Sequence, residues 1–312
     1  MTVNGGMFRM IFRRGIRNES FLKALEALAQ QDSWWRDVLA DNSLIIGIRD
    51  EYLNVYWQGQ SIFRVSFKAG TVTASTHQKY LLNPGIKGQI SLIGGSFDLS
   101  KAAETMLTRD YEGVTTLERL KKAAALYSGR EKEGVHEIAI SNPTIVDVEI
   151  AINAAAVSDV LRKLPRMDVA SFEKADTGVD LVFWEAKTFS NPELETGEVV
   201  KQVKEYRAVI AAHHADIAES YSCVAKNLLD MGKWSNGSRP IAQTTRDVAA
   251  GAKINVTGTT IGLLVYDFTA DQRDREDKDG NTLRKKLEKL FEQNELGIDR
   301  FRFKGTAKGL AL

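Results

Sequence analysis

The sequence contains few of the residues on which several common protein classes depend. Among its 312 residues there is one cysteine, Cys223, which excludes a disulfide within the chain and a zinc site built from several thiolates. Cys223 is expected to be a small, partly buried thiol. There are five prolines, no low-complexity tract and no run of about 18 consecutive apolar residues. The basic N-terminal stretch has no apolar run of signal-peptide length. We therefore expect a soluble, cytoplasmic protein with no membrane partner.

The charges of the chain are nearly balanced. Lys plus Arg number 42 and Asp plus Glu number 41, so net charge does not favour a protein that coats nucleic acid by electrostatic attraction alone. Acids gathered at a metal site can mask a local basic groove in such a total. A hydrophobic content of 43% and a charged content of 27% are ordinary for globular proteins. The length predicts about two domains.

The first part of the chain predicts an α+β domain. Helical spacing of apolar residues predicts a helix over 20–40, with Ser20 as a candidate cap. Short segments rich in β-branched and aromatic residues, broken by glycines, predict an antiparallel meander over 44–82. Helical periodicity returns over 99–127. Trp34 and Trp35 fit a core better than a platform for stacking bases.

The charged, glycine-flanked run 129–134 marks a predicted domain boundary. It separates an N-terminal domain at 1–130, of unknown role, from a second domain at 131–312. In the second domain strands alternate with helices, which favours an α/β fold with a mixed sheet. The expected elements are a strand or short helix at 145–152, a helix at 154–164, hairpin strands at 166–174 and 178–189, one long helix or two over 198–230, a strand at 261–268, a helix at 283–294 and a strand at 301–305.

The second hairpin strand carries a pair of opposite charges. Residues two apart in a strand share a face, so Glu185 and Lys187 point the same way. The apolar residues before them indicate a buried strand body. Burying the charged pair costs free energy unless a cation, a partner or solvent meets it, which fits a strand end that opens into a cleft. Pairing of the hairpin would bring Asp168 beside Glu185.

This grouping is typical of a divalent-metal site. Two carboxylates and the carbonyl of Ala186 offer hard oxygen ligands, which suit Mg²⁺ or Mn²⁺. Lys187 would then orient or deprotonate an attacking water, or neutralise charge in the transition state. Upstream, Glu149 is a third acid that completes the metal shell. Asp147 lies two residues from Glu149 on the same face and is the alternative candidate for this role.

A predicted helix after the strand carries further candidates. Gln202 and Tyr206 are four residues apart and therefore share one face of the helix. An amide and a phenol in this arrangement would hold the backbone of a substrate strand or brace the lysine. Lys201, Lys204 and Arg207 add positive charge for phosphate contacts.

In this order the residues resemble the motif of the PD-(D/E)xK nuclease superfamily, in its RecB-like branch. The matching residues are Glu149, Asp168, Glu185, Lys187, Gln202 and Tyr206. The resemblance covers about residues 136–210 and extends to the strand at 261–268. One departure is that Arg166 and Met167 separate Pro165 from Asp168. The upstream histidine of RecB-like members has only a weak candidate here, His136, and Glu149 is preferred.

The resemblance implies a restriction-endonuclease-like αβββαβ core and a divalent-metal-dependent phosphodiesterase. Asp168 and Glu185 would be metal ligands, Lys187 would be catalytic, and Gln202 and Tyr206 would contact substrate. The expected substrate is nucleic acid, with DNA ahead of RNA, and a homo-oligomer is compatible with the sequence.

Two other interpretations of the same residues stay open. In one, the fold is that of a nuclease but is catalytically silent, and the protein binds nucleic acid or acts as a sensor. In the other, residues 1–130 recognise a partner or substrate for the second domain. On a purely structural interpretation, Glu185 and Lys187 are a solvated cross-strand pair, and Gln202 and Tyr206 are the polar edge of a helix.

Overall fold

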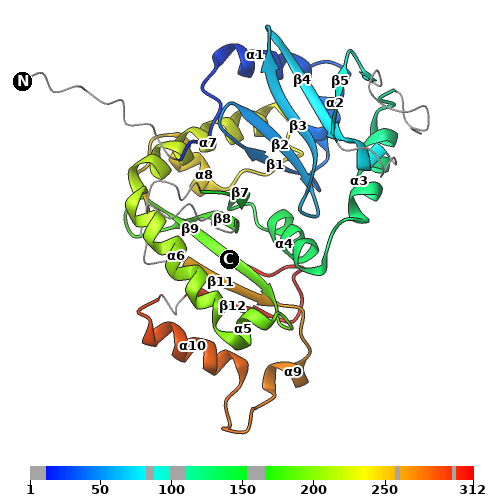
Figure 1. Ribbon diagram of the computed structural model, residues 1–312. Coiled ribbons are helices and arrows are strands. Elements are labelled where there is room, and N and C mark those ends of the chain that lie inside the picture. Colours follow the sequence, from blue (N-terminus) through cyan, green and yellow to red (C-terminus); the bar gives the residue numbers. More distant parts are fainter. Residues whose placement is uncertain (1–11, 82–87, 99–109, 153–165, 257–260, 297–299) are drawn as a thin grey trace, which may run out of the picture.

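Two six-stranded sheets organise the chain, which has a mixed α/β fold with one antiparallel and one mixed sheet (Figure 1). The computed structural model describes residues 12–81, 88–98, 110–152, 166–256, 261–296 and 300–312. None of the helices within these ranges is long and apolar enough to cross a membrane. The expected helix at 154–164 lies outside the described residues.

The antiparallel sheet follows chain order, each strand pairing with the next. The predicted meander over 44–82 is therefore confirmed, and it continues to residue 97. Its strands are β1 (Ile45–Ile48), β2 (Tyr52–Trp57), β3 (Gln60–Lys68), β4 (Thr71–His77), β5 (Gln89–Ile93) and β6 (Ser96–Phe97), with a 3-10 turn, η1 (Gln78–Leu81), between β4 and β5.

Helices cover one face of this sheet. They are α1 (Glu19–Ala29), α2 (Trp34–Ala40) and α3 (Val114–Ala125). Leu53, Val55 and Phe63 are buried on the covered face, and they share a core with both Trp34 and Trp35. The two tryptophans therefore fill the core, as the sequence favoured.

The single helix predicted over 20–40 is wrong, because two helices form there. Ser33 ends the first segment: its side chain accepts a hydrogen bond from Arg36 N and caps α2. Asn18 takes the capping role expected of Ser20, accepting from Phe21 N. Asn and Ser compete with the helix by bonding to nearby backbone, so they set helix starts.

The run expected to be a domain boundary is the beginning of a helix, α4 (Arg130–Ser141). Glu131 and Glu133 lie in its first turn, where carboxylates complement the helix dipole. The helix expected over 99–127 is present only as α3, and residues 99–109 lie outside the described ranges. The division into domains at 1–130 and 131–312 stays a prediction.

The mixed sheet has the order β12-β11-β9-β8-β7, with β10 pairing at the side of β9. The expected hairpin is confirmed, since β8 and β9 pair antiparallel, and β7 is a strand rather than a helix. β11 is parallel to β9 and to β12. The bounds are β7 (Ile145–Ile150), β8 (Met167–Lys174), β9 (Val179–Thr188), β10 (Ile254–Asn255), β11 (Ile261–Tyr266) and β12 (Phe301–Lys304).

Helices cover both faces of the mixed sheet. Trp184 packs in one cluster with Val135 of α4, whereas Phe183 packs in another with Val203 of α6. Gly262 makes the first cluster possible, because a Cβ there would lie 1.9 Å from the Trp184 ring. The segment 198–230 forms two helices. The remaining helices are α5 (Pro192–Thr196), α6 (Glu198–Ala212), α7 (His214–Trp234), α8 (Gln243–Ala249), α9 (Ala270–Asp274) and α10 (Leu283–Gln293).

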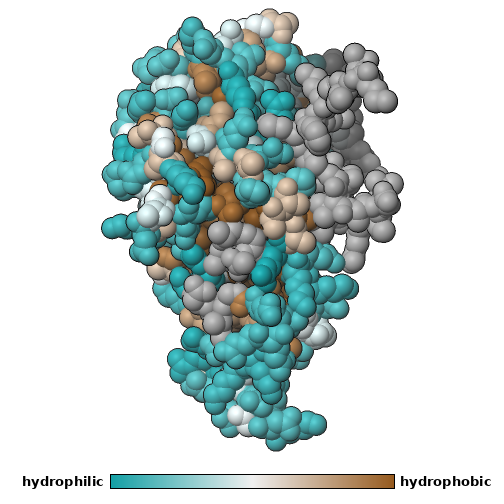
Figure 2. All heavy atoms as spheres, turned by 90° about the vertical axis from the view of Figure 1, so that its left-hand side faces the viewer, coloured by the Kyte–Doolittle hydropathy of each residue, from teal (hydrophilic) through white to brown (hydrophobic). Residues whose placement is uncertain are grey.

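A hydrophilic, narrow end extends beyond the mixed sheet. It contains α9 and α10, and Figure 2 shows it almost entirely in hydrophilic colours. In α10 only Leu287 and Phe291 are buried, so one stripe of the helix packs against the core and the rest meets solvent.

A buried carboxylate joins the two sheets. Asp147 on β7 is 1% exposed and forms ion pairs with Arg49 at 2.5 Å and with Arg14 at 3.3 Å. The hydroxyl of Tyr221 on α7 donates to it at 3.1 Å. Asp147 is thus fully engaged by side chains from the N-terminal segment, the antiparallel sheet and α7, which gives it a structural role.

Candidate functional site

The β8–β9 hairpin brings two predicted acids to the same end of the sheet. Val169 pairs with Trp184, and continuing this register by one pair puts Asp168 opposite Glu185. The backbone N–H of Ala186 donates to Oδ2 of Asp168 at 2.8 Å. Glu185 is 2% exposed, whereas Asp168 has intermediate exposure. The apolar strand body thus ends in two carboxylates, as expected.

Lys187 lies between two carboxylates. Its Nζ is 2.8 Å from Oε1 of Glu185 and 2.7 Å from Oε2 of Glu193 on α5. Burial alone would lower the pKa of Lys187, but the charge of Glu185 and hydrogen bonds to both acids raise that pKa above its ordinary value. The lysine is therefore protonated at neutral pH.

Both acids hold their protons unusually strongly. Burial raises the pKa of Glu185 to about 7, an effect that Lys187 only partly offsets. Burial and the charge of Glu185 raise the pKa of Asp168 well above its usual range, despite the hydrogen bond from Ala186. One lysine does not balance the carboxylates gathered here. Such a centre gains free energy by binding a proton or another cation.

Two further acids at the centre were not found from the sequence. Glu193 pairs with Lys187, and Glu131, in the first turn of α4, helps raise the pKa of both Asp168 and Glu185. Oε2 of Glu131 accepts from Nδ2 of Asn191 at 2.9 Å. Asn191 also caps α5, so one residue links the two acids. Only the tertiary fold brings α4 and α5 to this end of the sheet, and the local pattern gives no signal for it.

Gln202 and Tyr206 lie on α6 beside the carboxylates. Tyr206 is 1% exposed, and burial and the charges of Glu185 and Asp168 raise its pKa above the ordinary value. Its hydroxyl lies within hydrogen-bonding reach of the Glu185 carboxylate, whereas Oε1 of Gln202 is buried without a partner among the described residues. Buried polar atoms are rarely left without partners, so the Gln202 oxygen indicates a place for water, an ion or a ligand.

Glu149 is engaged by cations instead of by this group of residues. Its two oxygens are bound by Lys132, at 2.5 Å, and by Arg166, at 3.3 Å. His136 is buried, with Nδ1 accepting from Gln58 N, and its ring lies edge-on to Trp57. The basic residues expected to contact phosphate are on α6, where Lys201 pairs with Glu198 and Arg207 donates to the carbonyl of Glu295.

The donor set fits a hard cation in part. In the described ranges, no group of three or more His, Cys, Asp or Glu side chains is arranged to hold a metal ion. Asp168 and Glu185 nevertheless provide two carboxylates at one point. Oxygen ligands of this kind suit Mg²⁺ or Mn²⁺, with water or substrate supplying the remaining ligands.

Comparisons with protein-family models, with curated proteins and with solved structures found no match for the chain. The chemistry of the site combines excess carboxylate, a protonated lysine and, among the described residues, a buried amide oxygen with no partner.

Proposed function

We propose that the protein is a divalent-metal-dependent nuclease that hydrolyses phosphodiester bonds in nucleic acid, with DNA as the preferred substrate. One observation carries the proposal: the carboxylates of Asp168, Glu185 and Glu193 gather around a single lysine, and the pKa of both Asp168 and Glu185 is raised. A purely structural ion pair, with one carboxylate for one lysine, would leave no such excess of acid.

The fold supports the same proposal. The elements α4, β7, β8, β9, α6 and β11 occur along the chain in the order helix, three strands, helix and strand, with α5 between β9 and α6 and with α7, α8 and β10 between α6 and β11. This is the αβββαβ order expected of the PD-(D/E)xK superfamily, and the acids lie at the β8–β9 pair as its motif requires. We therefore propose that the chain is a member of the RecB-like branch.

Asp168, Glu185 and the carbonyl of Ala186 would hold the metal. When bound, Mg²⁺ or Mn²⁺ polarises the phosphate and lowers the pKa of water. The structure favours these ligands over Glu149, whose two oxygens are already bound to cations. Asp168 and Glu185 lose their protons as a cation binds, because its charge replaces the proton as the partner of the carboxylates.

Lys187 acts as a cation in this proposal. Because its pKa is raised, it keeps its proton at neutral pH and donates to the attacking water or to a phosphate oxygen, instead of acting as the base. Tyr206, whose pKa is also raised, stays protonated and donates to the substrate backbone. Gln202 Oε1 accepts from the water or the substrate.

The proposal is tested by incubating the protein with labelled single- and double-stranded DNA and RNA in Mg²⁺ or Mn²⁺. We expect cleavage that is lost in chelator and in Lys187→Ala, with DNA cut faster than RNA. The matched control is Lys174→Ala, at the opposite end of the hairpin, where the side chain is exposed. Cleavage that survives in Lys187→Ala would exclude this site.

A second function is favoured by one observation, the absence of a three-ligand metal group among the described side chains. A catalytically silent protein that binds nucleic acid with the same fold would need no such group. Binding of DNA or RNA without turnover in any divalent metal would support that function and exclude the nuclease.

A further inference from the structure

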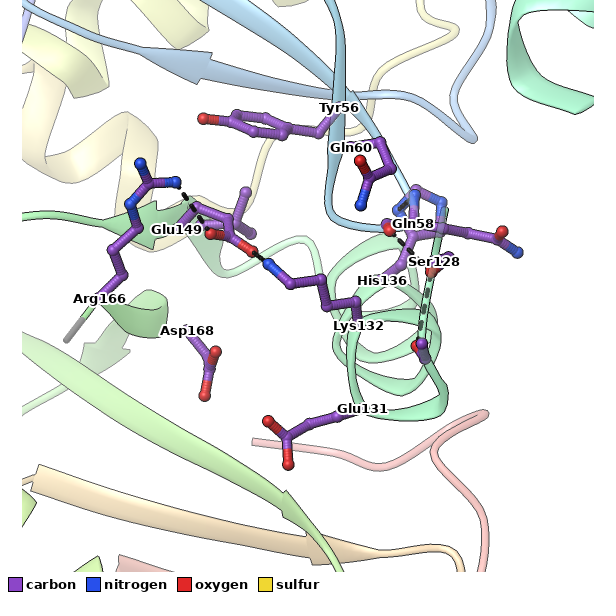
Figure 3. Close-up of polar contacts among 12 residues, drawn as sticks. Tyr56, Gln58, Gln60, Ser128, Glu131, Lys132, His136, Glu149, Arg166 and Asp168 are labelled. Carbon is purple, nitrogen blue, oxygen red and sulfur yellow. Dashed lines mark hydrogen bonds and ion pairs between the residues drawn. The ribbon is translucent and has the colours of Figure 1, made fainter. Parts of the chain in front are cut away.

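A second charged cluster lies next to the carboxylate centre. Lys132 on α4 and Arg166, immediately before β8, both bind the carboxylate of Glu149 (Figure 3). The side chains of the two cations are 46% and 55% exposed, whereas that of Glu149 is 11% exposed. Among the described residues, the cluster therefore has two cations for one anion and presents the cations to solvent.

The antiparallel sheet holds Lys132 in place. The β2–β3 turn is fixed on α4, because Gln58 N donates to Nδ1 of His136 at 3.2 Å and Oγ of Ser128 donates to the carbonyl of Gln58 at 2.9 Å. Gly59 in this turn lies against the lysine stem, and a Cβ there would be 2.7 Å from Cδ of Lys132. The lysine therefore approaches Glu149 from a fixed position.

Glu149 has an unusual backbone conformation. Its φ is +52°, in the left-handed region that residues other than glycine seldom occupy. Backbone of this kind costs free energy and persists where the surrounding structure fixes it, often at functional sites. The carboxylate of this residue lies between the two cations.

The cluster and Asp168 lie near one another in the close-up view (Figure 3). Arg166 precedes Asp168 by two residues, and Figure 3 shows Arg166, Glu149 and Lys132 on one side of Asp168 with Glu131 beyond it. A substrate strand that places one phosphate at Asp168 would carry its neighbouring phosphates past these cations.

We propose that Lys132 and Arg166 form a two-cation clamp for a backbone phosphate of the nucleic-acid strand, and that Glu149 occupies the place of this phosphate in the free protein. The proposal rests on the proposed function, because it names how the same site holds its substrate. An arginine and a lysine together suit a phosphate, the arginine through two N–H groups and the lysine as a point charge. Glu149 is a positioning residue that keeps the two cations together until the phosphate replaces it.

The test measures binding of a labelled DNA strand by fluorescence anisotropy in chelator, over a range of salt concentrations. Lys132→Gln and Arg166→Gln should each weaken binding about 5-fold or more, and each should reduce the salt slope by about 1, as expected for one lost phosphate contact. Glu149→Gln should strengthen binding several-fold, because the clamp is freed. Lys174→Gln, at the far end of β8, is the control and should change neither quantity.

Two controls identify the ligand and the role of Glu149. Inorganic phosphate at millimolar concentration should compete poorly with the strand; displacement of the strand by free phosphate alone would overturn a clamp for nucleic acid. Mn²⁺ binding, followed by electron paramagnetic resonance, should be unchanged in Glu149→Gln. Loss of Mn²⁺ in that variant would make Glu149 a metal ligand and overturn its role as the occupant of the clamp.

The outcomes separate this proposal from the nuclease itself. If the wild type cuts DNA and the salt slope is unchanged in Lys132→Gln and Arg166→Gln, the clamp is wrong and the nuclease stands. If the wild type binds DNA with the expected losses in both variants but never cuts it, the clamp stands and the nuclease fails. A wild type that binds no strand overturns the clamp.

Discussion

Replacing Glu185 by glutamine should make the metal-free protein more stable at alkaline pH. The pKa of Glu185 is raised from 4.5 to about 7 in the folded protein, so its ionised form destabilises the fold. Linkage gives the sign of the effect. The stability that protonated Glu185 contributes is fully present below pH 4.5, and it is lost as the pH rises through 7. One pKa unit corresponds to about 1.4 kcal/mol, so the loss approaches about 3 kcal/mol at pH 8.

Glutamine resembles the protonated acid at every pH. Relative to the wild type, Glu185→Gln should therefore be more stable by about 3 kcal/mol at pH 8 and by about 1 kcal/mol at pH 5. Urea unfolding in chelator, followed by the combined fluorescence of the five tryptophans, measures both differences. Mn²⁺ at 100 times its dissociation constant should stabilise only the wild type, by about 2.7 kcal/mol.

The opposite result would refute the reasoning. If Glu185 and Lys187 were simply a stabilising ion pair, removing one partner would destabilise the protein by about 3 to 5 kcal/mol at pH 8. A variant that is less stable than the wild type, or a difference in stability that does not change with pH, would show that the ionised carboxylates do not destabilise the metal-free protein.

Three further predictions concern the fold. Asp147→Asn should lower the free energy of unfolding by about 3 to 5 kcal/mol, because it leaves Arg49 buried without its anion. Mn²⁺ binding should persist in this variant. An unchanged denaturation midpoint would contradict the prediction. Gly262→Ala should cost about 3 kcal/mol in urea unfolding, because the new Cβ meets the Trp184 ring, and a neutral effect would show that the ring can move aside. Burial lowers the pKa of His136 from 6.5 to about 4, because it disfavours the charged imidazolium. The stability that neutral His136 contributes is therefore present above pH 6.5, and it falls by about 2 kcal/mol on going from pH 7 to pH 4.5. The variant His136→Gln should not lose this stability at low pH. If the free energy of unfolding had the same pH dependence in both proteins, the prediction would be wrong.

The hairpin and its charges were predictable because they depend on local pattern. The apolar body of β9 and the two-residue spacing of Glu185 and Lys187 are properties of a strand. Antiparallel pairing with β8 then places Asp168 opposite Glu185. The relation of Gln202 to Tyr206 follows equally from helical spacing.

Other parts of the site depend on tertiary structure and could not be predicted locally. Glu131 and Glu193 come from α4 and α5, which meet the sheet end only in the folded chain. The expectation that Asp147 and Glu149 share a face assumed regular strand geometry throughout β7. The strand is not regular, because its pairing with β8 shifts register between Ile145 and Asp147 and Glu149 has a left-handed conformation. Burial among arginines commits Asp147 to the fold.

The central claim is that Asp168 is part of a metal-dependent phosphodiesterase site. The most direct measurement is the single-turnover rate of DNA cleavage in Mn²⁺ by the wild type, by Asp168→Asn and by Asp176→Asn, which changes an exposed acid at the hairpin turn. We expect Asp168→Asn to reduce the rate by about 100-fold or more, while Asp176→Asn matches the wild type. Equal rates in all three proteins, or no cleavage by the wild type in any divalent metal, would contradict the account.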